Sequence, residues 1–98
     1  MSDIQRYPAG SYIFREGESA QYAYVLQSGT VAIVKLGADG EAVIVELSEK
    51  GTIFGEMALI DENPRSAGAK AQDDVEVTGV DKSVFLDYVS KNPQAAHN

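Results

Sequence analysis

The chain has 98 residues, of which 44% are apolar, and its 15 Asp and Glu outnumber its 8 Lys and Arg to give a formal net charge of −7. It contains no cysteine, which excludes thiolate metal sites, thiol nucleophiles and disulfides and predicts a cytoplasmic protein. The negative charge disfavours nucleic acid as a direct partner, and no apolar stretch is long enough for insertion into a membrane. We expect one domain over residues 1–98, because a chain of this length buries roughly two thirds of its unfolded surface on folding.

Six short runs have the composition of β-strands and are separated by turn residues. They recur at the spacing of an all-β sandwich or barrel and cover residues 11–14, 22–26, 30–36, 41–47, 68–71 and 75–80. Between the third and fourth runs, Gly37-Ala38-Asp39-Gly40 predicts a hairpin, because an Asp-Gly pair tolerates positive φ. Both faces of residues 31–36 are largely apolar, as in a strand inside a closed two-sheet shell. This pattern predicts a jelly roll or a small barrel.

A helix is predicted near the C-terminus. Asp81 or Ser83 would cap it, and it would end near Pro93. Lys91 in its last turn suits the negative end of the helix dipole. Its apolar stripe consists of Val84, Phe85, Tyr88 and Val89.

Residues 51–71 interrupt the strand pattern. After Gly55, residues 56–60 are good helix formers, and residues 61–64 end the helix at a proline. The N–H groups that begin such a short helix form an anion site, and Arg65 would bring a guanidinium to the same place. A phosphate would fit there.

A purely structural interpretation of these residues is also open. In it Gly55 is a turn, Glu56 is a capping carboxylate and Arg65 is a surface charge paired with Glu56. Composition and periodicity do not decide between the two interpretations.

The order of residues in this segment resembles the phosphate-binding cassette of cyclic nucleotide-binding domains. The matching blocks are Phe54-Gly55-Glu56-Met57-Ala58-Leu59 and Pro64-Arg65-Ser66-Ala67. Upstream, three blocks look like the first strands of that family: Tyr7-Pro8-Ala9-Gly10, Phe14-Arg15-Glu16-Gly17-Glu18 and Tyr24-Val25-Leu26-Gln27-Ser28-Gly29-Thr30-Val31. The resemblance covers residues 6–92. It implies a mainly β fold, an eight-stranded antiparallel jelly roll or β-barrel with a short cassette helix and a C-terminal helix.

The resemblance also implies roles for individual residues. Glu56 would accept a hydrogen bond from the ribose 2′-hydroxyl, helped by the N–H of Gly55. Arg65 would pair with the exocyclic oxygens of the cyclic phosphate, a contact that lysine does not copy. The N–H groups of Ala58 and Ser66 and the Ser66 hydroxyl would complete the phosphate shell. The candidate ligand-binding residues are therefore Phe54, Gly55, Glu56, Met57, Ala58, Arg65, Ser66 and Ala67.

Two further points concern these residues. Core packing, rather than direct ligand contact, is the role that we expect for both Met57 and Leu59; Met57 stays among the candidates, and Leu59 is left out of the site. The resemblance favours cAMP over cGMP as the ligand, because the position three after the arginine, often Thr or Ser in the family, is Gly68 here. Ser66 does not discriminate, since relatives that bind either base carry a hydroxyl there.

The output of such a domain would have to come from another molecule. The sequence contains no helix-turn-helix, kinase or channel motif, and we expect a regulatory sensor module that is not an enzyme and has no catalytic residues. The family's longer C-terminal lid helix and its helix before the first strand are not recognisable here. We therefore expect modest affinity unless a second copy or an effector protein supplies a lid, with residues 83–91 carrying the signal through Phe85 and Tyr88.

Two rival interpretations remain. One is a degenerate jelly roll that binds no nucleotide and serves as an interaction or dimerisation module. The other is a metal-dependent enzyme of the cupin type, which needs several histidines, whereas His97 is the only histidine in the sequence. Acid–base catalysis by Glu56 would lack a second titratable group. We expect no metal.

Overall fold

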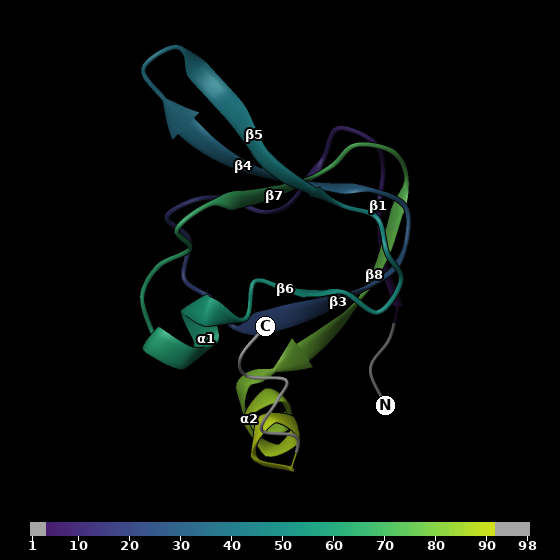
Figure 1. Cartoon of the computed structure of the whole chain (residues 1–98), viewed down its shortest axis with the longest axis vertical. Coiled ribbons are helices and arrows are strands. Elements are labelled where there is room, and N and C mark those ends of the chain that lie inside the picture. The colour runs from purple at the N-terminus through teal and green to yellow at the C-terminus, as the bar shows by residue number, and fades with distance from the viewer. Residues whose placement is uncertain (1–3, 92–98) are drawn as a thin grey trace.

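The computed structural model describes residues 4–91 and consists mainly of two four-stranded antiparallel sheets stacked on each other (Figure 1). One sheet has the strand order β1-β8-β3-β6 and the other has the order β2-β7-β4-β5. The strands are β1 (Ile4–Tyr7), β2 (Tyr12–Phe14), β3 (Tyr22–Ser28), β4 (Val31–Gly37), β5 (Gly40–Leu47), β6 (Ile53–Phe54), β7 (Gly68–Ala71) and β8 (Val75–Asp81), and the helices are α1 (Met57–Asp61) and α2 (Lys82–Lys91). The mainly β, antiparallel jelly-roll class is confirmed, as an open sandwich, because the strands of residues 4–91 form two separate sheets.

The six predicted strands are all present, with ends shifted by no more than two residues. Two strands were missed, β1 and β6. The mixed sequence of β1 has no clear alternation, and it is held by pairing with β8 from Ile4↔Thr78 to Tyr7↔Val75. Strand β6 has only two residues, too few for any period to show, and it pairs with Tyr24 and Val25 of β3.

The main core lies between the two sheets. Leu26, Val31 and Val77 are fully buried within it. At one end of this core, Phe14, Tyr24 and Phe54 pack against one another, with ring centroids 5.7 to 6.2 Å apart, in the range of favourable aromatic pairs. The three rings come from β2, β3 and β6, so both sheets meet at this point.

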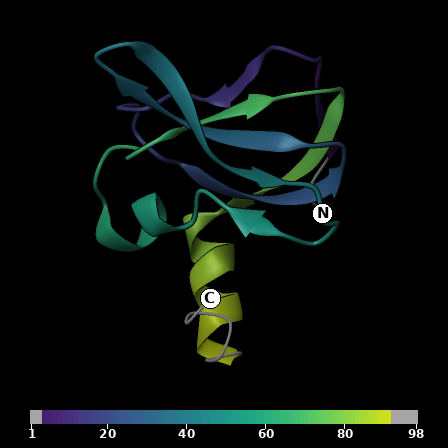
Figure 2. The same cartoon turned by 45° about the horizontal axis from the view of Figure 1, so that its top comes forward.

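A second, smaller core joins the two helices to the sandwich. It contains Ala23 of β3, Leu59 of α1 and Phe85 of α2. The expected core role of Leu59 is confirmed. Because α2 leaves the end of β8 and extends away from the sheets (Figure 2), one side of it packs, and Tyr88 of the expected stripe is 45% exposed.

The start of α2 is fixed by the first of its two candidate caps. The Asp81 carboxylate accepts a hydrogen bond from the Val84 N–H at 2.9 Å, and the Ser83 hydroxyl donates to the same oxygen at 3.0 Å. These contacts, the Val84 N–H first, lower the pKa of Asp81. Pro93, the predicted end of the helix, lies outside the described residues.

The predicted hairpin joins β4 to β5 and projects beyond the sandwich (Figure 1). Gly40 adopts a φ of 108°, which the tight turn requires. Burial of both faces of residues 31–36 was expected, but Leu36 is 66% exposed, because β7 pairs with β4 only as far as Val34 and no strand covers the rest of the ribbon.

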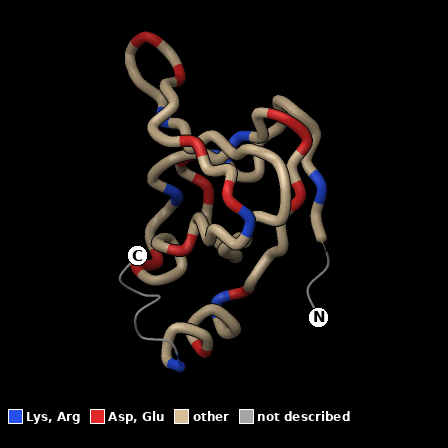
Figure 3. Tube along the Cα trace, turned by 45° about the vertical axis from the view of Figure 1, so that its right-hand side comes forward, with Lys and Arg blue, Asp and Glu red and all other residues tan. Residues whose placement is uncertain are grey.

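Acidic residues are spread along the trace rather than gathered in one patch (Figure 3). Neither helix within residues 4–91 is long and apolar enough to cross a membrane.

Candidate functional site

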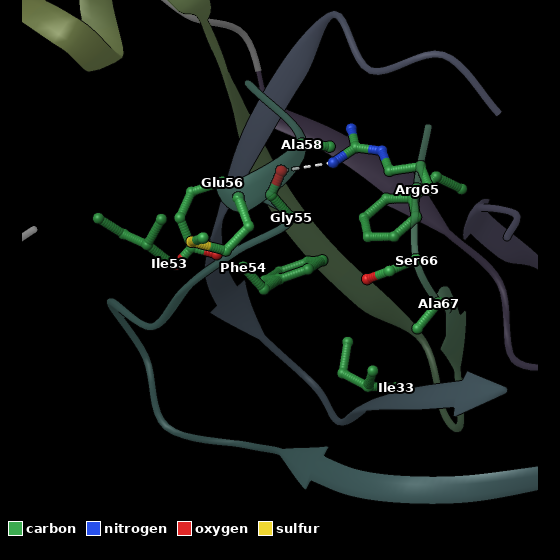
Figure 4. A pocket seen from close by; sticks show the side chains of 11 residues that line it. Ile33, Ile53, Phe54, Gly55, Glu56, Ala58, Arg65, Ser66 and Ala67 are labelled. Carbon is green, nitrogen blue, oxygen red and sulfur yellow. Dashed lines mark hydrogen bonds between the residues drawn. The ribbon is translucent and has the colours of Figure 1, made fainter. Parts of the chain in front are cut away.

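A pocket of about 230 Å³ opens beside α1, between the two sheets. Figure 4 shows residues 53–58 on one side of it, residues 65–67 on the other, and Ile33 of β4 between them. All eight predicted site residues line this pocket. The structure adds three more, namely Phe14, Ile33 and Ile53.

Arg65 is the buried charge of this pocket, with 5% of its surface exposed. Its Nη1 donates to the Gly55 carbonyl, and its Nη2 donates to the Tyr22 carbonyl at 2.6 Å. The guanidinium carbon lies 4.0 Å from the centroid of the Phe14 ring, close enough for a cation–π contact. The side chain is thus held between β3, the start of α1 and the aromatic end of the core.

The backbone of Arg65 is fixed as well. Its N–H donates to the Glu18 carbonyl and its carbonyl accepts from the Gly17 N–H, both at 2.8 Å. The loop after β2 therefore holds the arginine in place without contacting its charged end.

The guanidinium has no acidic partner. Within residues 4–91, none of the ion pairs involves Arg65, and its buried Nε has no hydrogen-bond acceptor. Burial lowers the pKa of Arg65, although the side chain stays charged at neutral pH because an unperturbed guanidinium titrates so high. A buried cation with an unused donor and no carboxylate beside it is a site for an anion.

The structural interpretation of Arg65 and Glu56 is therefore wrong. Arg65 is buried and makes no ion pair with Glu56, and Glu56 stands at the N-cap of α1 without a side-chain capping bond. Its carboxylate lines the pocket, where its negative charge acts on Arg65 from a distance.

Position 55 requires a glycine because the side chains of Arg65 and Phe14 approach its backbone closely. Its φ is 76°, in the left-handed region that favours glycine. A Cβ at this position would lie 2.7 Å from Nη1 of Arg65 and 2.9 Å from the Phe14 ring. Any side chain here would push the guanidinium out of its place.

The remaining predicted residues differ in their surroundings. Met57 is 60% exposed, so the core packing that was expected for it is wrong. Ser66 is exposed, and its side chain extends toward Phe54 across the pocket (Figure 4). The Ala58 N–H belongs to the first turn of α1, where helix geometry supplies no acceptor.

Gly68 does not line this pocket. It faces a second groove on the outer surface of the β2-β7-β4-β5 sheet, and a Cβ there would meet Val34 at 3.2 Å. A hydroxyl at this position would therefore point away from the site, and the base preference drawn from Gly68 loses its support.

Within residues 4–91, no three His, Cys, Asp or Glu side chains gather into a group that could hold a metal ion. His97, on which the comparison with a cupin rested, lies outside the described residues.

Comparison with known proteins gives the family. The sequence profile of the cyclic nucleotide-binding domain matches residues 4–92. The chain belongs to this family. The cyclic AMP receptor protein of Thermus thermophilus is 36% identical to this cyclic nucleotide-binding domain over 100 aligned positions, which cover 100% of the chain and 46% of the relative.

Two other relatives are several times longer than this chain. The cAMP-dependent protein kinase regulatory subunit of Pyricularia oryzae is 35% identical over 83 positions, covering 85% of this chain and 20% of the subunit. The EAL enzyme Bd1971 is 36% identical, and its structures in cAMP-bound and cGMP-bound forms match 90% of this chain with TM-scores of 0.82 and 0.83, covering 24% and 23% of that enzyme. This cyclic nucleotide-binding domain thus spans less than half the length of these relatives.

Proposed function

We propose that this domain binds a 3′,5′-cyclic nucleotide, cAMP in preference to cGMP, and acts as a regulatory sensor without catalytic activity. The observation that carries the proposal is the guanidinium of Arg65, which is buried at the pocket and has, within residues 4–91, no carboxylate partner and an unused Nε–H. The domain's membership of the cyclic nucleotide-binding family indicates which class of anion would bind there.

The cyclic phosphate would bind to Arg65 from the Nε side. A guanidinium has five N–H donors, and the bonds to the carbonyls of Gly55 and Tyr22 engage two of them. The Nε–H and a neighbouring N–H are left for two phosphate oxygens, so the ligand would not have to break the existing contacts. The N–H groups of Ala58 and Ser66, with the Ser66 hydroxyl, would complete the shell, and small Ala67 would let the ligand approach closely.

The ribose would face Glu56 on the other side of the pocket. Its carboxylate would accept a hydrogen bond from the free 2′-hydroxyl, next to the N–H of Gly55. A carboxylate here would repel a phosphate placed at the 2′ position, which disfavours other phosphorylated nucleosides.

The base would lie against apolar side chains. Phe54 and Met57, with Ile33 and Ile53, line the same pocket and bring no polar group to it. Guanine carries more exocyclic donors and acceptors than adenine, and burying them unpaired costs free energy. This argument supports cAMP, independently of Gly68.

A titration with a modified ligand tests the ribose contact. We expect Glu56→Ala to weaken cAMP binding roughly ten- to hundredfold, the size of a hydrogen bond to a charged group. The same substitution should leave the affinity for 2′-deoxy-cAMP nearly unchanged, because that ligand has no hydroxyl to lose. Calorimetric titration of both proteins with both ligands, and with cGMP, measures the difference.

Three results would count against the proposal. Equal losses of affinity for cAMP and 2′-deoxy-cAMP would show that Glu56 does not contact the ribose 2′-hydroxyl. Tighter binding of cGMP than of cAMP would overturn the base preference. No heat with any nucleotide would favour the degenerate interaction module.

The smaller core supports a proposed route for the signal. Leu59 of α1 and Phe85 of α2 belong to the same buried cluster, so a shift of the cassette helix would reach α2 directly. We propose that α2 passes ligand binding to a second copy or an effector protein, and that this partner supplies a lid. With a net charge of −7, direct contact with nucleic acid is not part of the proposal.

A further inference from the structure

Lys35 of β4 connects the sheet to the cassette at a point outside the pocket. Its ammonium group donates to the Ser66 carbonyl at 2.6 Å and lies 3.2 Å from the Glu16 carboxylate. The other oxygen of Glu16 accepts the Leu36 N–H at 3.0 Å. Three segments that are distant in sequence therefore meet here.

This contact replaces missing strand pairing. Strand β7 begins at Gly68 and pairs with β4 as far as Val34. Beyond this pair the backbone of β4 has no neighbour in β7, and Glu16 provides an acceptor for the next free N–H of β4, that of Leu36. The Leu36 N–H first, and Lys35 second, lower the pKa of Glu16, so the carboxylate is ionised at neutral pH.

The segment that carries Arg65 is thereby held at two successive residues. The backbone of Arg65 bonds to Gly17 and Glu18 in the loop after β2. The next carbonyl, that of Ser66, bonds to Lys35. Because the peptide group is planar, fixing the Arg65 carbonyl fixes the direction of the Ser66 N–H, and the bond from Lys35 to the Ser66 carbonyl fixes the next peptide group of the same residue.

We propose that Lys35 and Glu16 are positioning residues that hold the peptide of Ser66 in the orientation in which residues 65–67 receive the ligand phosphate. This inference rests on the proposed function for its effect on affinity. Its structural part, the immobilisation of Ser66, stands without any ligand.

A long-range effect of charge is the competing explanation. Lys35 adds a positive charge near the proposed phosphate, and this alone would favour an anion. The two explanations differ in the sign of one effect. If charge alone acts, Glu16→Gln removes a negative charge and tightens binding, whereas if positioning acts, it weakens binding.

The experiment combines backbone dynamics with affinity. Order parameters from ¹⁵N relaxation of the unliganded chain report the mobility of Ser66 and Ala67. We expect Lys35→Met and Glu16→Gln each to lower these order parameters and to weaken cAMP binding roughly two- to fivefold, the size expected for an exposed ion pair. Lys35→Arg, which keeps the charge and a donor, should restore most of both.

Lys70→Met is the matched control. Lys70 lies on the same sheet in β7, and its ammonium group is 3.6 Å from Glu41, but it does not line the pocket. Its replacement removes the same charge and an exposed ion pair, and should change neither readout.

Each outcome decides one claim. Unchanged order parameters in Lys35→Met would overturn the inference, whether or not a nucleotide binds. Tighter binding in Glu16→Gln would overturn it in favour of charge alone. Failure of the unsubstituted chain to bind cAMP would contradict the proposed function, while the order parameters would still decide whether Lys35 and Glu16 hold Ser66.

Discussion

Replacing Arg65 with alanine is expected to weaken cAMP binding by about 2–5 kcal/mol, a loss of roughly thirtyfold to several thousandfold, because a desolvated phosphate would lose its countercharge. The carbonyls of Gly55 and Tyr22 would also lose their donors, so we expect a measurable loss of stability as well. Calorimetric titration and chemical denaturation measure the two effects separately.

Arg65→Lys separates charge from geometry in the same experiment. Lysine keeps the positive charge but has no planar fork, so most of the affinity should still be lost. Arg15→Ala is the control, because Arg15 is exposed, stacks on Tyr12 at 4.1 Å and does not line the pocket. An Arg65→Lys variant that binds cAMP as tightly as the unsubstituted chain would show that Arg65 does not hold the phosphate by two parallel hydrogen bonds.

Replacing Phe14 with alanine is expected to cost about 3–5 kcal/mol of stability, as for other buried phenylalanines. Phe14 packs against Tyr24 and Phe54 in the core, and the face of its ring lies against the guanidinium of Arg65. Small domains are stable by only about 5–15 kcal/mol, so this variant would be close to unfolding. Chemical denaturation measures the loss.

Phe14→Leu keeps the core apolar and tests the support of Arg65. We expect a smaller loss of stability together with weaker cAMP binding, because the aromatic face under the cation is gone. Val77→Ala truncates another buried side chain of the main core, one that does not line the pocket, and should reduce stability while leaving affinity nearly unchanged. A Phe14→Leu variant that binds cAMP as tightly as Val77→Ala would show that Phe14 supports the fold only.

The fold was predictable from sequence wherever the signal was local. The hairpin at residues 37–40 and the strands that flank it follow from turn chemistry and strand composition. Strands β1 and β6 were missed, because they form by pairing with β8 and β3 and their own sequences show no strand pattern. The exposure of Leu36 was missed for a similar reason, because the end of β7 decides it.

The candidate site was predictable where its residues are consecutive. The blocks at residues 54–58 and 65–67 line one pocket, as their order indicated. Phe14, Ile33 and Ile53 were missed, because only the stacking of two sheets brings them beside the cassette. The base preference drawn from Gly68 lost its support for a local reason. Side chains alternate between the two faces of β7, and position 68 lies on the outer face.

The burial of Arg65 was the least predictable feature. From the sequence alone, Arg65 could equally be an exposed charge at the protein surface. It is buried because of contacts with Tyr22 and Gly55 that only the tertiary structure creates. The single domain over residues 1–98 and the cytoplasmic location stay predictions.

The most direct test of the central claim is the Nε–H resonance of Arg65 in ¹⁵N-labelled chain during titration with cAMP. Arg65→Lys identifies the signal by its disappearance, and Arg6, whose Nε already bonds to Glu76 at 2.7 Å, provides an internal reference. The account predicts that the Arg65 signal moves to lower field and exchanges more slowly with water as the phosphate takes up the unpaired donor, while the Arg6 signal stays in place. An Arg65 signal that does not move when the nucleotide is bound would contradict the account.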